Sequence, residues 1–490
     1  MTPAPPQSLP QKAVIAALLA VMAVFYAWTA GSAEFSLRPA KSLSGYYNLL
    51  ADAFLAGQLS LRVQPTPELL ALPDPYDPVQ NQPYRLHDAA LFEGKYYLYY
   101  GPAPALVVFA PFRALTGLDL PQSLGAAAAC WTGLVCSFLL LRFFVRLGLS
   151  ETPSWLLAAA VPALAFGNIV PFLLRRPSHY EVAIAFGYAL VFASLYCFAT
   201  GSLGARVSLR RLALASVLLG LAVGSRFPML AAALAPFILY AYLRRRSDGR
   251  AARRRLALAL AMLGPLAVCL FLLGLYNYER FGSWTDFGLR HTLQGIVSAR
   301  QYTFVSMERI PTSFFYYVLV PPRFAAEFPF VTLEPQAYLA PPPGYVLERV
   351  AGILPMVPLL SVLLVLPVML RRLWLGQRAL PVAIGASIAI GCALLGLYCL
   401  SGGTMRYEVD FATFLLLPAL LLWFAVLRTA GRRARRVLAT AFVLLLAATV
   451  SFNGAISLTG YYNNLERANS KVYERLWRVF RPLERALGAR

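Results

Sequence analysis

The stretch AVIAALLAVMAVFYAWTAGSA, residues 13–33, contains no charged side chain. As an α-helix, an apolar run of this length is long enough to cross the hydrocarbon core of a bilayer, which is roughly 30 Å thick. A second run of this kind, VLATAFVLLLAATVSFNGAISL, occupies residues 437–458 near the other end of the chain. These two stretches predict an all-α polytopic membrane protein.

The composition of the whole chain agrees with this prediction. Hydrophobic residues make up 59% of the 490 residues and charged residues only 13%, unlike a soluble globular domain. Further apolar segments lie between the two terminal ones, so we expect a bundle of about eleven transmembrane helices. The expected spans are residues 13–33, 121–142, 154–173, 182–200, 211–225, 228–243, 256–275, 351–370, 380–400, 410–427 and 437–458.

Basic residues are concentrated in alternate connections between the expected spans. If the N-terminus is cytoplasmic, the cytoplasmic connections hold 21 of the 44 Lys and Arg residues, and their only acids are Glu151 and Asp248. The two long connections on the other side, 34–120 and 276–350, carry nearly balanced charge. This positive-inside distribution explains much of the net charge of +22 and argues against nucleic-acid binding. With the Ala-, Arg- and Leu-rich composition, it predicts a multi-pass protein of a bacterial inner (plasma) membrane with both long loops extracytoplasmic.

The expected spans divide the chain into six parts. Apolar residues recur at helical spacing in the last part, which predicts an amphipathic helix lying on a membrane face. An odd number of spans places this tail outside, whereas one miscounted span would place it inside. The parts are an N-terminal anchor helix (1–33), a first extracytoplasmic loop with interfacial helices (34–120), a transmembrane module (121–275), a second extracytoplasmic loop (276–350), C-terminal transmembrane helices (351–458) and the amphipathic tail (459–490).

The first long loop holds two candidate general bases, Asp52 and Asp88. Asp52 lies in SGYYNLLADAFLAGQLSL (44–61), where polar residues recur every four positions and predict an interfacial helix. Asp88 ends the proline-rich stretch PDPYDPVQNQPYRLHD (73–88), which predicts an ordered loop or a lid. A carboxylate in a dry pocket can take a proton from a hydroxyl group, whereas a solvated one is an ordinary surface acid. Both remain candidates, alone or as a base and its orienting group.

The stretch GKYYLYYGPAPALVVFAPFRALTG, residues 94–117, follows these acids. Its apolar part is too short to span a membrane comfortably, and its tyrosines suit the membrane interface. We therefore expect a helix that lies flat against the outer leaflet or dips into it, with Lys95 as a candidate phosphate-binding cation. The second long loop is rich in aromatic residues and proline, which favours a folded cap over a flexible linker.

The short connection RRPSHYE, residues 175–181, places Glu181 at the start of an expected span. A charge at the bilayer centre costs roughly 2.5–3.5 kcal/mol on insertion scales, so Glu181 is expected to have a partner. Arg175, Arg176 and His179 are the candidates for that partner. The pattern favours a functional role and a purely structural ion pair about equally.

The connection SGGTMRYEVDF, residues 401–411, presents Arg406 and Tyr407 between two expected spans. A planar guanidinium can hold two oxygens of a phosphate at once. The alternative is that the two acids that follow clamp Arg406. Arg226, in GSRFP (224–228), is a further phosphate-binding candidate, for which the alternative is a helix-end side chain that reaches toward water.

Taken together, these segments resemble the GT-C superfamily of glycosyltransferases, which use sugars linked to polyprenyl phosphate. That group includes protein O-mannosyltransferases, lipid A aminoarabinose transferases and the catalytic subunit of oligosaccharyltransferase. The resemblance covers nearly the whole chain in order. Within the superfamily, the chain is similar to bacterial membrane proteins that carry LADAFLAGQLSL, GKYYLYYGPAPAL, YNYERFG and RYEVDF, here residues 50–61, 94–106, 276–282 and 406–411.

The resemblance implies inverting transfer of a sugar to an acceptor on the extracytoplasmic face, with a carboxylate of the first loop as general base. In most relatives this carboxylate begins the first interfacial helix, near Ser44 or Gly45 here, and neither of these residues can act as a base. Asp52 and Asp88 therefore remain the catalytic candidates. The candidates for binding the donor and its lipid phosphate are Arg406, Tyr407, Arg226, Lys95, Arg176, His179 and Glu181.

Two other classes of protein fit the same composition, namely a polysaccharide or lipid transporter and a non-catalytic membrane assembly protein. Transporters commonly contain internal repeats and charges at the middle of the membrane, and the sequence has no convincing repeat. No cofactor is predicted, and a divalent cation is left open because Asp52, Asp88 and Glu181 could hold one only by converging. The expected partners are a polyprenyl-phosphate-linked sugar, a glycan, lipid or protein acceptor, and membrane lipids, but not nucleic acid.

Overall fold

A computed structural model describes the fold of most of the chain. The N-terminal segment 1–8, the segment 33–44, the segment 246–251 and the last two residues are among those not described, so Ser44 and Asp248 lie outside the described part. The described residues are 9–32, 45–204, 206–245, 252–295, 298–300, 302–333, 338–374 and 378–488.

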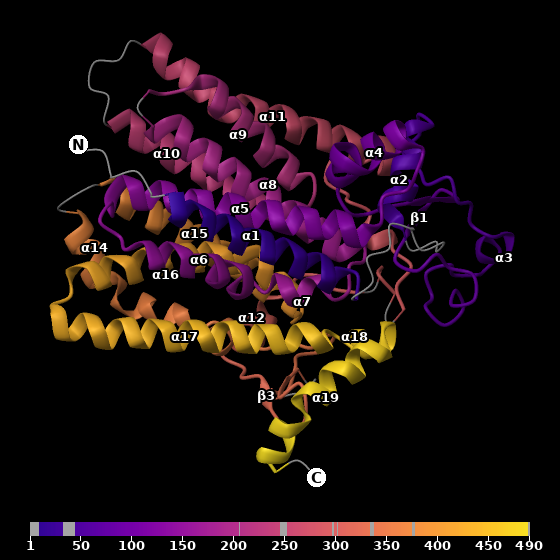
Figure 1. Ribbon diagram of the computed structural model, residues 1–490. Helices are drawn as coiled ribbons and strands as arrows, with labels where there is room; N and C mark the ends of the chain where they lie inside the picture. Colours follow the sequence, from indigo (N-terminus) through magenta and orange to yellow (C-terminus); the bar gives the residue numbers. More distant parts are fainter. Residues whose placement is uncertain are drawn as a thin grey trace.

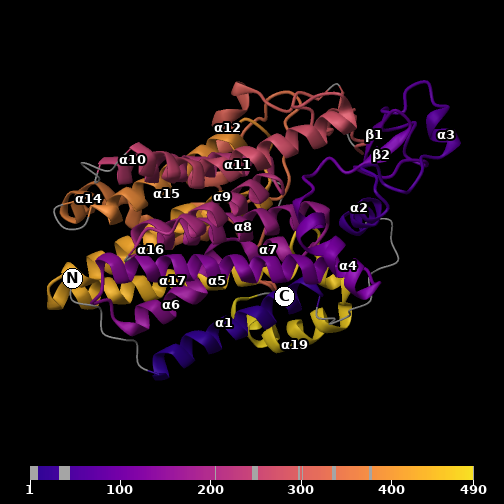
Figure 2. The ribbon, with the colours of Figure 1, turned by 90° about the horizontal axis from the view of Figure 1, so that it is seen from above.

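Eight helices in the described part are long and apolar enough to cross a membrane, and they lie side by side in one bundle (Figures 1 and 2). The chain is therefore a multi-pass membrane protein in its composition and helix lengths, as predicted. These helices are α1 (Leu9–Ala30), α5 (Gln122–Gly148), α8 (His179–Leu203), η2 with α10 (Phe227–Ala233 and Leu234–Arg245), α11 (Ala252–Phe281), α15 (Ala379–Cys399), η6 with α16 (Met405–Tyr407 and Glu408–Thr429) and α17 (Arg432–Thr459).

The other three expected spans are shorter or interrupted, so the count of eleven stays a prediction. The span expected at 154–173 is broken, because one helix ends at Gly167 and the next begins at Val170, with Ile169 between them at a φ of 63°. The span expected at 351–370 contains Pro358, which begins a tighter 3₁₀ segment. The elements are α6 (Ser154–Gly167), α7 (Val170–Leu174), α9 (Leu209–Val223), α13 (Ile353–Met356), η5 (Pro358–Val365) and α14 (Leu366–Trp374).

The middle of the bundle is formed by α8 and α16, which are the most buried of the long helices. Small residues let neighbouring helices approach them, as is usual in membrane proteins. A Cβ atom added to Gly133 of α5 would lie 2.3 Å from the ring of Tyr188 on α8. One added to Gly220 of α9 would lie 2.3 Å from the Cβ of Cys269 on α11. Large side chains on one helix therefore fill the gaps left by glycines on the next.

Both long loops lie at the same end of the bundle, as predicted from their charge. Backbone hydrogen bonds join them directly, because Asp88 N donates to Leu293 O and Leu293 N donates to Ala89 O. The first loop forms α2 (Tyr46–Leu55), α3 (Pro67–Leu70), β1 (Ala90–Phe92), β2 (Lys95–Tyr97), η1 (Ala105–Phe109) and α4 (Ala110–Thr116). The second forms η3 (Leu289–His291), η4 (Met307–Arg309), α12 (Ile310–Val318), β3 (Arg323–Phe324) and β4 (Val331–Thr332).

The helix expected in the apolar part of 94–117 is present, but a β-hairpin precedes it. Residues 90–97 form a β-hairpin, and helix begins only at Ala105, after the Gly101–Pro104 segment. Proline and glycine at these positions prevent an earlier helix start. A helix is present in 44–61, as expected, namely α2, and the second loop is folded, as expected.

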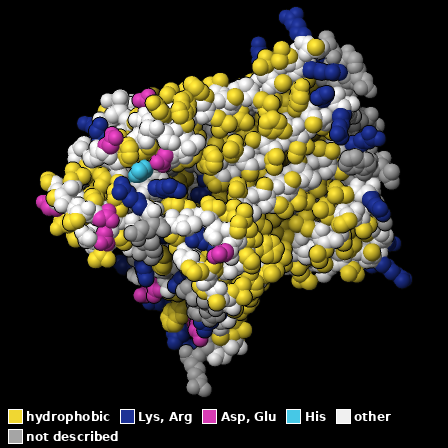
Figure 3. All heavy atoms as spheres, turned by 180° about the vertical axis from the view of Figure 1, so that it is seen from behind, with side chains coloured by type: hydrophobic (Ala, Val, Ile, Leu, Met, Phe, Trp, Pro, Cys, Tyr) yellow, Lys and Arg dark blue, Asp and Glu magenta, His cyan; other side chains and the backbone are white. Residues whose placement is uncertain are grey.

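The two ends of the bundle differ in charge, and a hydrophobic band separates them on the face shown in Figure 3. On that face, one end carries Lys and Arg alone, whereas the other mixes acids, histidine and basic residues. We call the end that holds the two long loops the polar end, and the opposite end the basic end. This arrangement fits a membrane around the middle of the bundle, because a charged surface is costly in hydrocarbon.

The C-terminal tail packs against the polar end. It forms α18 (Asn464–Ala468) and α19 (Ser470–Ala486), which confirms the predicted amphipathic helix. The Phe480 ring stacks on Phe328 of the second loop at 5.3 Å between centroids. A Glu484 carboxylate oxygen accepts a hydrogen bond from the Phe328 backbone at 2.6 Å. The tail therefore lies on the same side as the two long loops.

The first loop is fixed to the bundle by a close backbone approach at Gly101. A Cβ atom at this position would lie 1.9 Å from Gly224 O, and Ala103 N donates a hydrogen bond to that same carbonyl. This contact positions the loop beside Arg226, two residues further along. Only glycine fits here without moving the backbone.

Gly101→Ala is therefore expected to lower the apparent melting temperature of the detergent-solubilised protein by several degrees, because one backbone segment must move away from the other. Gly264→Ala on α11 is the matched control, since an added Cβ there meets nothing within 4 Å. Alanine also favours helix over glycine by roughly 1 kcal/mol, so the control should melt at the same or a higher temperature. Equal melting of the Gly101→Ala variant and the parent would contradict the close approach.

Candidate functional site

The N-terminus of α8 holds the first group of site residues, at the polar end. Ser178 caps the helix, and the Glu181 side chain turns back to accept hydrogen bonds from the Ser178 backbone and hydroxyl. Glu181 is fully buried, and its other oxygen lies 3.3 Å from Arg176 Nη2. The predicted pairing of Glu181 is therefore confirmed with Arg176. Arg175 instead turns toward α17 and donates to Ser457 O.

Arg406 lies on η6 and joins this group from the other half of the chain. Its Nη1 is 3.7 Å from the same Glu181 oxygen that pairs with Arg176. Its Nη2 is 3.0 Å from a carboxylate oxygen of Glu348, near the end of the second loop. Glu348 also accepts a hydrogen bond from the Thr404 hydroxyl. Two arginines and two carboxylates from three connections thus form one network.

Aromatic rings enclose the two arginines. Tyr461 follows α17, and the centre of its ring lies 4.7 Å from the Arg176 guanidinium carbon. The Tyr461 hydroxyl accepts a hydrogen bond from the Arg406 backbone at 3.1 Å. Tyr180 lies 4.8 Å from the Arg406 guanidinium. Cation–π contacts of this kind hold an arginine in a fixed plane while leaving its N–H edges available.

Asp88 lies in the turn before β1 and is almost buried, with 8% of its surface exposed. Its backbone has a φ of 60° and is held by the hydrogen bond to Leu293 O. The His87 ring lies 3.3 Å from its carboxylate. Burial raises the pKa of Asp88 above its usual value, and the positive charges of His87, Arg406, Arg85 and Arg176 oppose this rise. The Asp88 carboxylate therefore interacts electrostatically with Arg176 and Arg406, and we call these residues and their close neighbours the arginine group.

Arg226 forms a second cation site beside the first. It is buried and pairs with Asp410 of α16, while its Nε also lies 3.1 Å from the Tyr398 hydroxyl. Tyr407 lies 4.5 Å from the Arg226 guanidinium and 5.5 Å from that of Arg406, so it stands between the two sites. The expectation that the Arg226 side chain reaches toward water is therefore wrong. The expectation that Asp410 clamps Arg406 is also wrong, because Asp410 pairs with Arg226.

His179, Tyr46 and Tyr100 close the group from the side of the first loop. The His179 ring lies 4.4 Å from Tyr46 and 5.7 Å from Tyr100, between ring centroids. The Tyr46 hydroxyl donates to His87 O, next to Asp88. Burial raises the pKa of both tyrosines, so both hydroxyls stay protonated at neutral pH. They can donate hydrogen bonds but cannot act as anions there.

Several buried nitrogen atoms of this group have no hydrogen-bond partner. They are Nε of Arg176, Nε and Nη1 of Arg406, and Nε2 of His179. Buried polar atoms are nearly always paired, so each such group calls for an explanation. The guanidinium nitrogens can only donate, and His179 Nε2 donates in one of its two tautomers, so these atoms suit a ligand with acceptor oxygens such as a phosphate.

Two of the sequence candidates lie outside this group. Asp52 on α2 pairs with Arg62 at 3.3 Å and with Arg113 at 3.0 Å, and no recorded contact joins it to Arg406. Lys95, at the first position of β2, is exposed. The group therefore contains Asp88, Arg176, His179, Glu181, Arg406 and Tyr407, with Arg226 adjacent.

Sequence reasoning missed two members, Glu348 and Tyr461. Tyr461 carries a signal in the sequence, because the motif GYYN at 45–48 recurs at 460–463. The first tyrosine of each copy, Tyr46 or Tyr461, is buried beside the group. Glu348 has no comparable signal, since it follows a proline-rich stretch and reaches Arg406 only through the fold.

The acids of the described residues do not gather as metal ligands. No three side chains of His, Cys, Asp or Glu within the described ranges lie together as a metal site needs. Asp52 is held in its own network, so it does not converge with Asp88 and Glu181. Asp52, Asp88 and Glu181 therefore do not form a joint site for a divalent cation.

No protein-family profile and no curated protein matches the sequence. Among solved structures, the apo oligosaccharyltransferase of Archaeoglobus fulgidus is similar in fold, with a TM-score of 0.51, 13% identity and 96% of this chain covered. This chain spans 60% of the length of that enzyme. ArnT from Cupriavidus metallidurans, bound to undecaprenyl phosphate, matches with a TM-score of 0.44 and 13% identity over 93% of this chain and 77% of its own. The fold is thus similar to that of the Archaeoglobus oligosaccharyltransferase, as the predicted resemblance requires, and at such identity the likeness concerns the fold alone.

Proposed function

We propose that this protein is a membrane glycosyltransferase of GT-C type. It transfers one sugar from a polyprenyl phosphate carrier to an acceptor on the extracytoplasmic face, with inversion at the anomeric carbon. The observation that carries the proposal is the gathering of Arg176, Arg406 and His179, with unpaired buried nitrogen atoms, beside the buried carboxylate of Asp88. This arrangement supports a site with anion-binding donors and a general base at one end of the membrane bundle.

The donors suit the phosphate of the leaving lipid. Glu181 and Glu348 fix the two guanidinium groups by occupying part of their N–H edges. The Nε atoms of Arg176 and Arg406 have no hydrogen-bond partner among the described residues, so they can donate to phosphate oxygens. As the glycosidic bond breaks, negative charge grows on the phosphate, and prepositioned donors stabilise that charge with little rearrangement. The charge balance of the network also keeps the arginines stable in the absence of a ligand.

Asp88 acts as the base. Its carboxylate accepts the proton of an acceptor hydroxyl group while the hydroxyl oxygen forms a bond to the anomeric carbon. The bond from that carbon to the phosphate oxygen breaks on the opposite face, and the lipid phosphate leaves as an anion beside Arg176 and Arg406. Burial supports this role, since a raised pKa makes the carboxylate a stronger base than a solvated aspartate.

The position at the end of the bundle suits a donor carried on a lipid. Nucleotide sugars and ATP are not supplied outside a cytoplasmic membrane, so a sugar used there has to arrive on a membrane carrier. The positive-inside distribution favours the polar end as the extracytoplasmic one. An isoprenoid tail can then remain in the bilayer while its phosphate reaches the arginines at the membrane surface.

The pH dependence of transfer is expected to follow Asp88. Its pKa is raised in the folded protein, and the carboxylate is the active form, so kcat should be lost as pH falls through a value above that of ordinary aspartate. His87 lowers this pKa by its charge, so His87→Ala should move the acidic limb of the profile to higher pH. A profile of kcat against pH for both proteins measures this shift. An unchanged acidic limb in the variant would contradict the assignment.

Transfer can be tested without knowing the acceptor. Purified protein in nanodiscs is incubated with a panel of polyprenyl-phosphate monosaccharides and an envelope extract, and release of free polyprenyl phosphate is measured. A donor that is consumed supports the proposal, provided that Asp88→Asn abolishes the consumption. Movement of an intact donor across proteoliposomes, without release of the phosphate, would instead identify a lipid transporter. Neither release nor movement would favour an assembly protein.

A further inference from the structure

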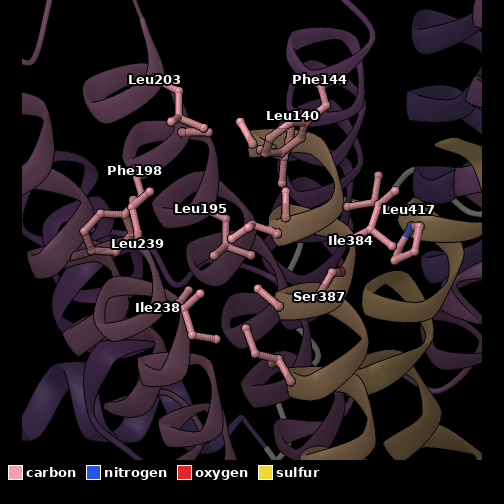
Figure 4. A pocket seen from close by; sticks show the side chains of 18 of the residues that line it. Leu140, Phe144, Leu195, Phe198, Leu203, Ile238, Leu239, Ile384, Ser387 and Leu417 are labelled. Carbon is pink, nitrogen blue, oxygen red and sulfur yellow. The ribbon is translucent and has the colours of Figure 1, made fainter. Parts of the chain in front are cut away.

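An apolar groove lies on the bundle well away from the polar end. It has a volume of about 110 Å³ and is bounded by α5, α8, α10, α15 and α16. Figure 4 shows leucine, isoleucine and phenylalanine side chains pointing into the space from several helices. Its lining includes Leu140 near the end of α5, Leu203 at the end of α8 and Ala379 at the start of α15. These positions place the groove toward the basic end.

The lining is almost entirely apolar, and Tyr242 supplies its one phenol hydroxyl. Ser387 is the only hydroxyl of serine or threonine among the lining residues, and it already donates to Phe414 O at 2.7 Å. An apolar cavity of about 150 Å³ can hold a benzene-sized molecule in a protein interior. At about 110 Å³ the groove is smaller than that cavity but partly open, so it suits a short segment of hydrocarbon chain. Because it lies among spanning helices, hydrocarbon from the bilayer is the material available to fill it.

Two of the helices that line the groove, α10 and α15, carry an arginine at their ends at the basic end of the bundle. Arg245 lies seven residues after Ile238 on α10, and Arg378 lies four residues before Val382 of α15. Both spacings put the arginine on the same face of its helix as the lining residue. Both arginines are exposed, and within the described ranges neither has a recorded ion pair. They stand where the headgroup of a lipid in the groove would lie.

We propose that this groove binds one acyl chain of an anionic phospholipid, with its phosphate held by Arg245 and Arg378. The anionic class follows from charge, since the basic end carries these arginines and only one described acid near it, Glu151, which pairs with Arg428. Juxtamembrane arginines attract anionic headgroups, whereas they gain little from a zwitterionic one. The site is separate from the proposed catalytic group and does not depend on it.

Native mass spectrometry of the full-length protein in mild detergent tests the proposal. The protein is equilibrated with phosphatidylglycerol or with phosphatidylcholine of identical acyl chains, and retained lipid is measured at equal collision energy. We expect at least one phosphatidylglycerol to be retained in preference to phosphatidylcholine. The double variant Arg245→Gln/Arg378→Gln should retain about tenfold less phosphatidylglycerol. Ala383→Trp, which fills the groove, should reduce retention of both lipids.

Matched variants separate the groove from general effects. Arg432→Gln/Arg433→Gln removes two exposed arginines from the start of α17, and Leu260→Trp adds a ring to an exposed position of α11. Both controls should retain lipid as the parent does. Equal retention of the two lipids by the parent, or full retention by either groove variant, would overturn the proposal. So would displacement of phosphatidylglycerol by undecaprenyl phosphate in the Arg406→Gln background, because the groove would then be a binding site for the carrier chain.

Discussion

Replacing Asp88 with asparagine is expected to lower kcat for sugar transfer by about 10²- to 10⁴-fold, the range typical of a lost general base. The amide keeps the size of the side chain and its neighbour His87, but it cannot accept the hydroxyl proton. Donor binding should change little, because the arginines that face the phosphate are untouched. The measurement is the rate of polyprenyl phosphate release under saturating donor, together with the donor KM.

Two other aspartates provide the comparison. Asp286 pairs with His291 at 3.0 Å in the second loop, and thus reproduces the aspartate–histidine contact of Asp88 outside the arginine group. Asp286→Asn should keep kcat within a few-fold of the parent. Asp52→Asn breaks the ion pairs with Arg62 and Arg113 and decides between the two candidates of the first loop. A loss of kcat in Asp52→Asn that exceeds the loss in Asp88→Asn would make Asp52 the base.

Replacing Arg406 with glutamine is expected to lower kcat/KM by about 10²- to 10³-fold, as when a prepositioned donor to a developing oxyanion is removed. The change also leaves Glu181 and Glu348 with one cation fewer, which weakens the network itself. Arg406→Lys separates the two effects, because lysine keeps the charge but cannot offer two parallel N–H groups. We expect Arg406→Lys to fold like the parent and to remain at least tenfold impaired in kcat/KM.

A buried arginine outside the group serves as the control for folding. Arg309 of η4 is buried and bonds to Tyr302 and to Gly344 O, with no recorded acidic partner in the described residues. Arg309→Gln should lower the melting temperature without a selective loss of kcat/KM. If Arg309→Gln and Arg406→Lys lose activity in proportion to stability alone, the role of Arg406 in phosphate binding is contradicted.

The sequence identifies those site residues that stand beside the ends of apolar helices. Charged residues are costly beside apolar spans unless they are paired, so a hydropathy profile alone singles out Glu181, Arg176 and Arg406. Their mutual pairing is less visible, because Arg406 and Glu181 come from opposite halves of the chain. Glu348 and Tyr461 reach Arg406 across separations of 58 and 55 residues, which no local pattern encodes.

Asp52 and Asp88 differ in how much of their surroundings a local pattern can predict. Helical spacing places Asp52 on the polar stripe of α2, and the structure agrees about the helix. The partner that occupies Asp52, Arg113, lies on α4 and is brought there by the packing of α2 against α4. Asp88 has no periodic pattern around it, and its burial depends on the backbone pairing with Leu293. Burial, and with it the pKa, is set by tertiary contacts.

Helix lengths are likewise predictable from the sequence in some places and not in others. Long apolar runs such as α1, α5 and α17 form as the composition predicts, because propensity and hydropathy agree along their whole length. The runs at 154–173 and 351–370 are just as apolar but stop at Ile169 and Pro358. A residue in the left-handed conformation or a 3₁₀ segment changes the backbone without changing hydropathy, so a hydropathy profile does not predict it.

Arg176, Arg406 and Asp88 are proposed to form one site for a lipid-linked sugar phosphate. Photo-crosslinking measures this directly, with a polyprenyl phosphate that carries a photoreactive group in the first isoprene unit and the protein reconstituted in nanodiscs. We expect labelled peptides from residues 175–181 and 404–408, and their labelling should fall in Arg406→Lys and in the presence of excess unlabelled carrier. Labelling confined to apolar surfaces of the bundle, unchanged by competitor or by that substitution, would contradict the claim.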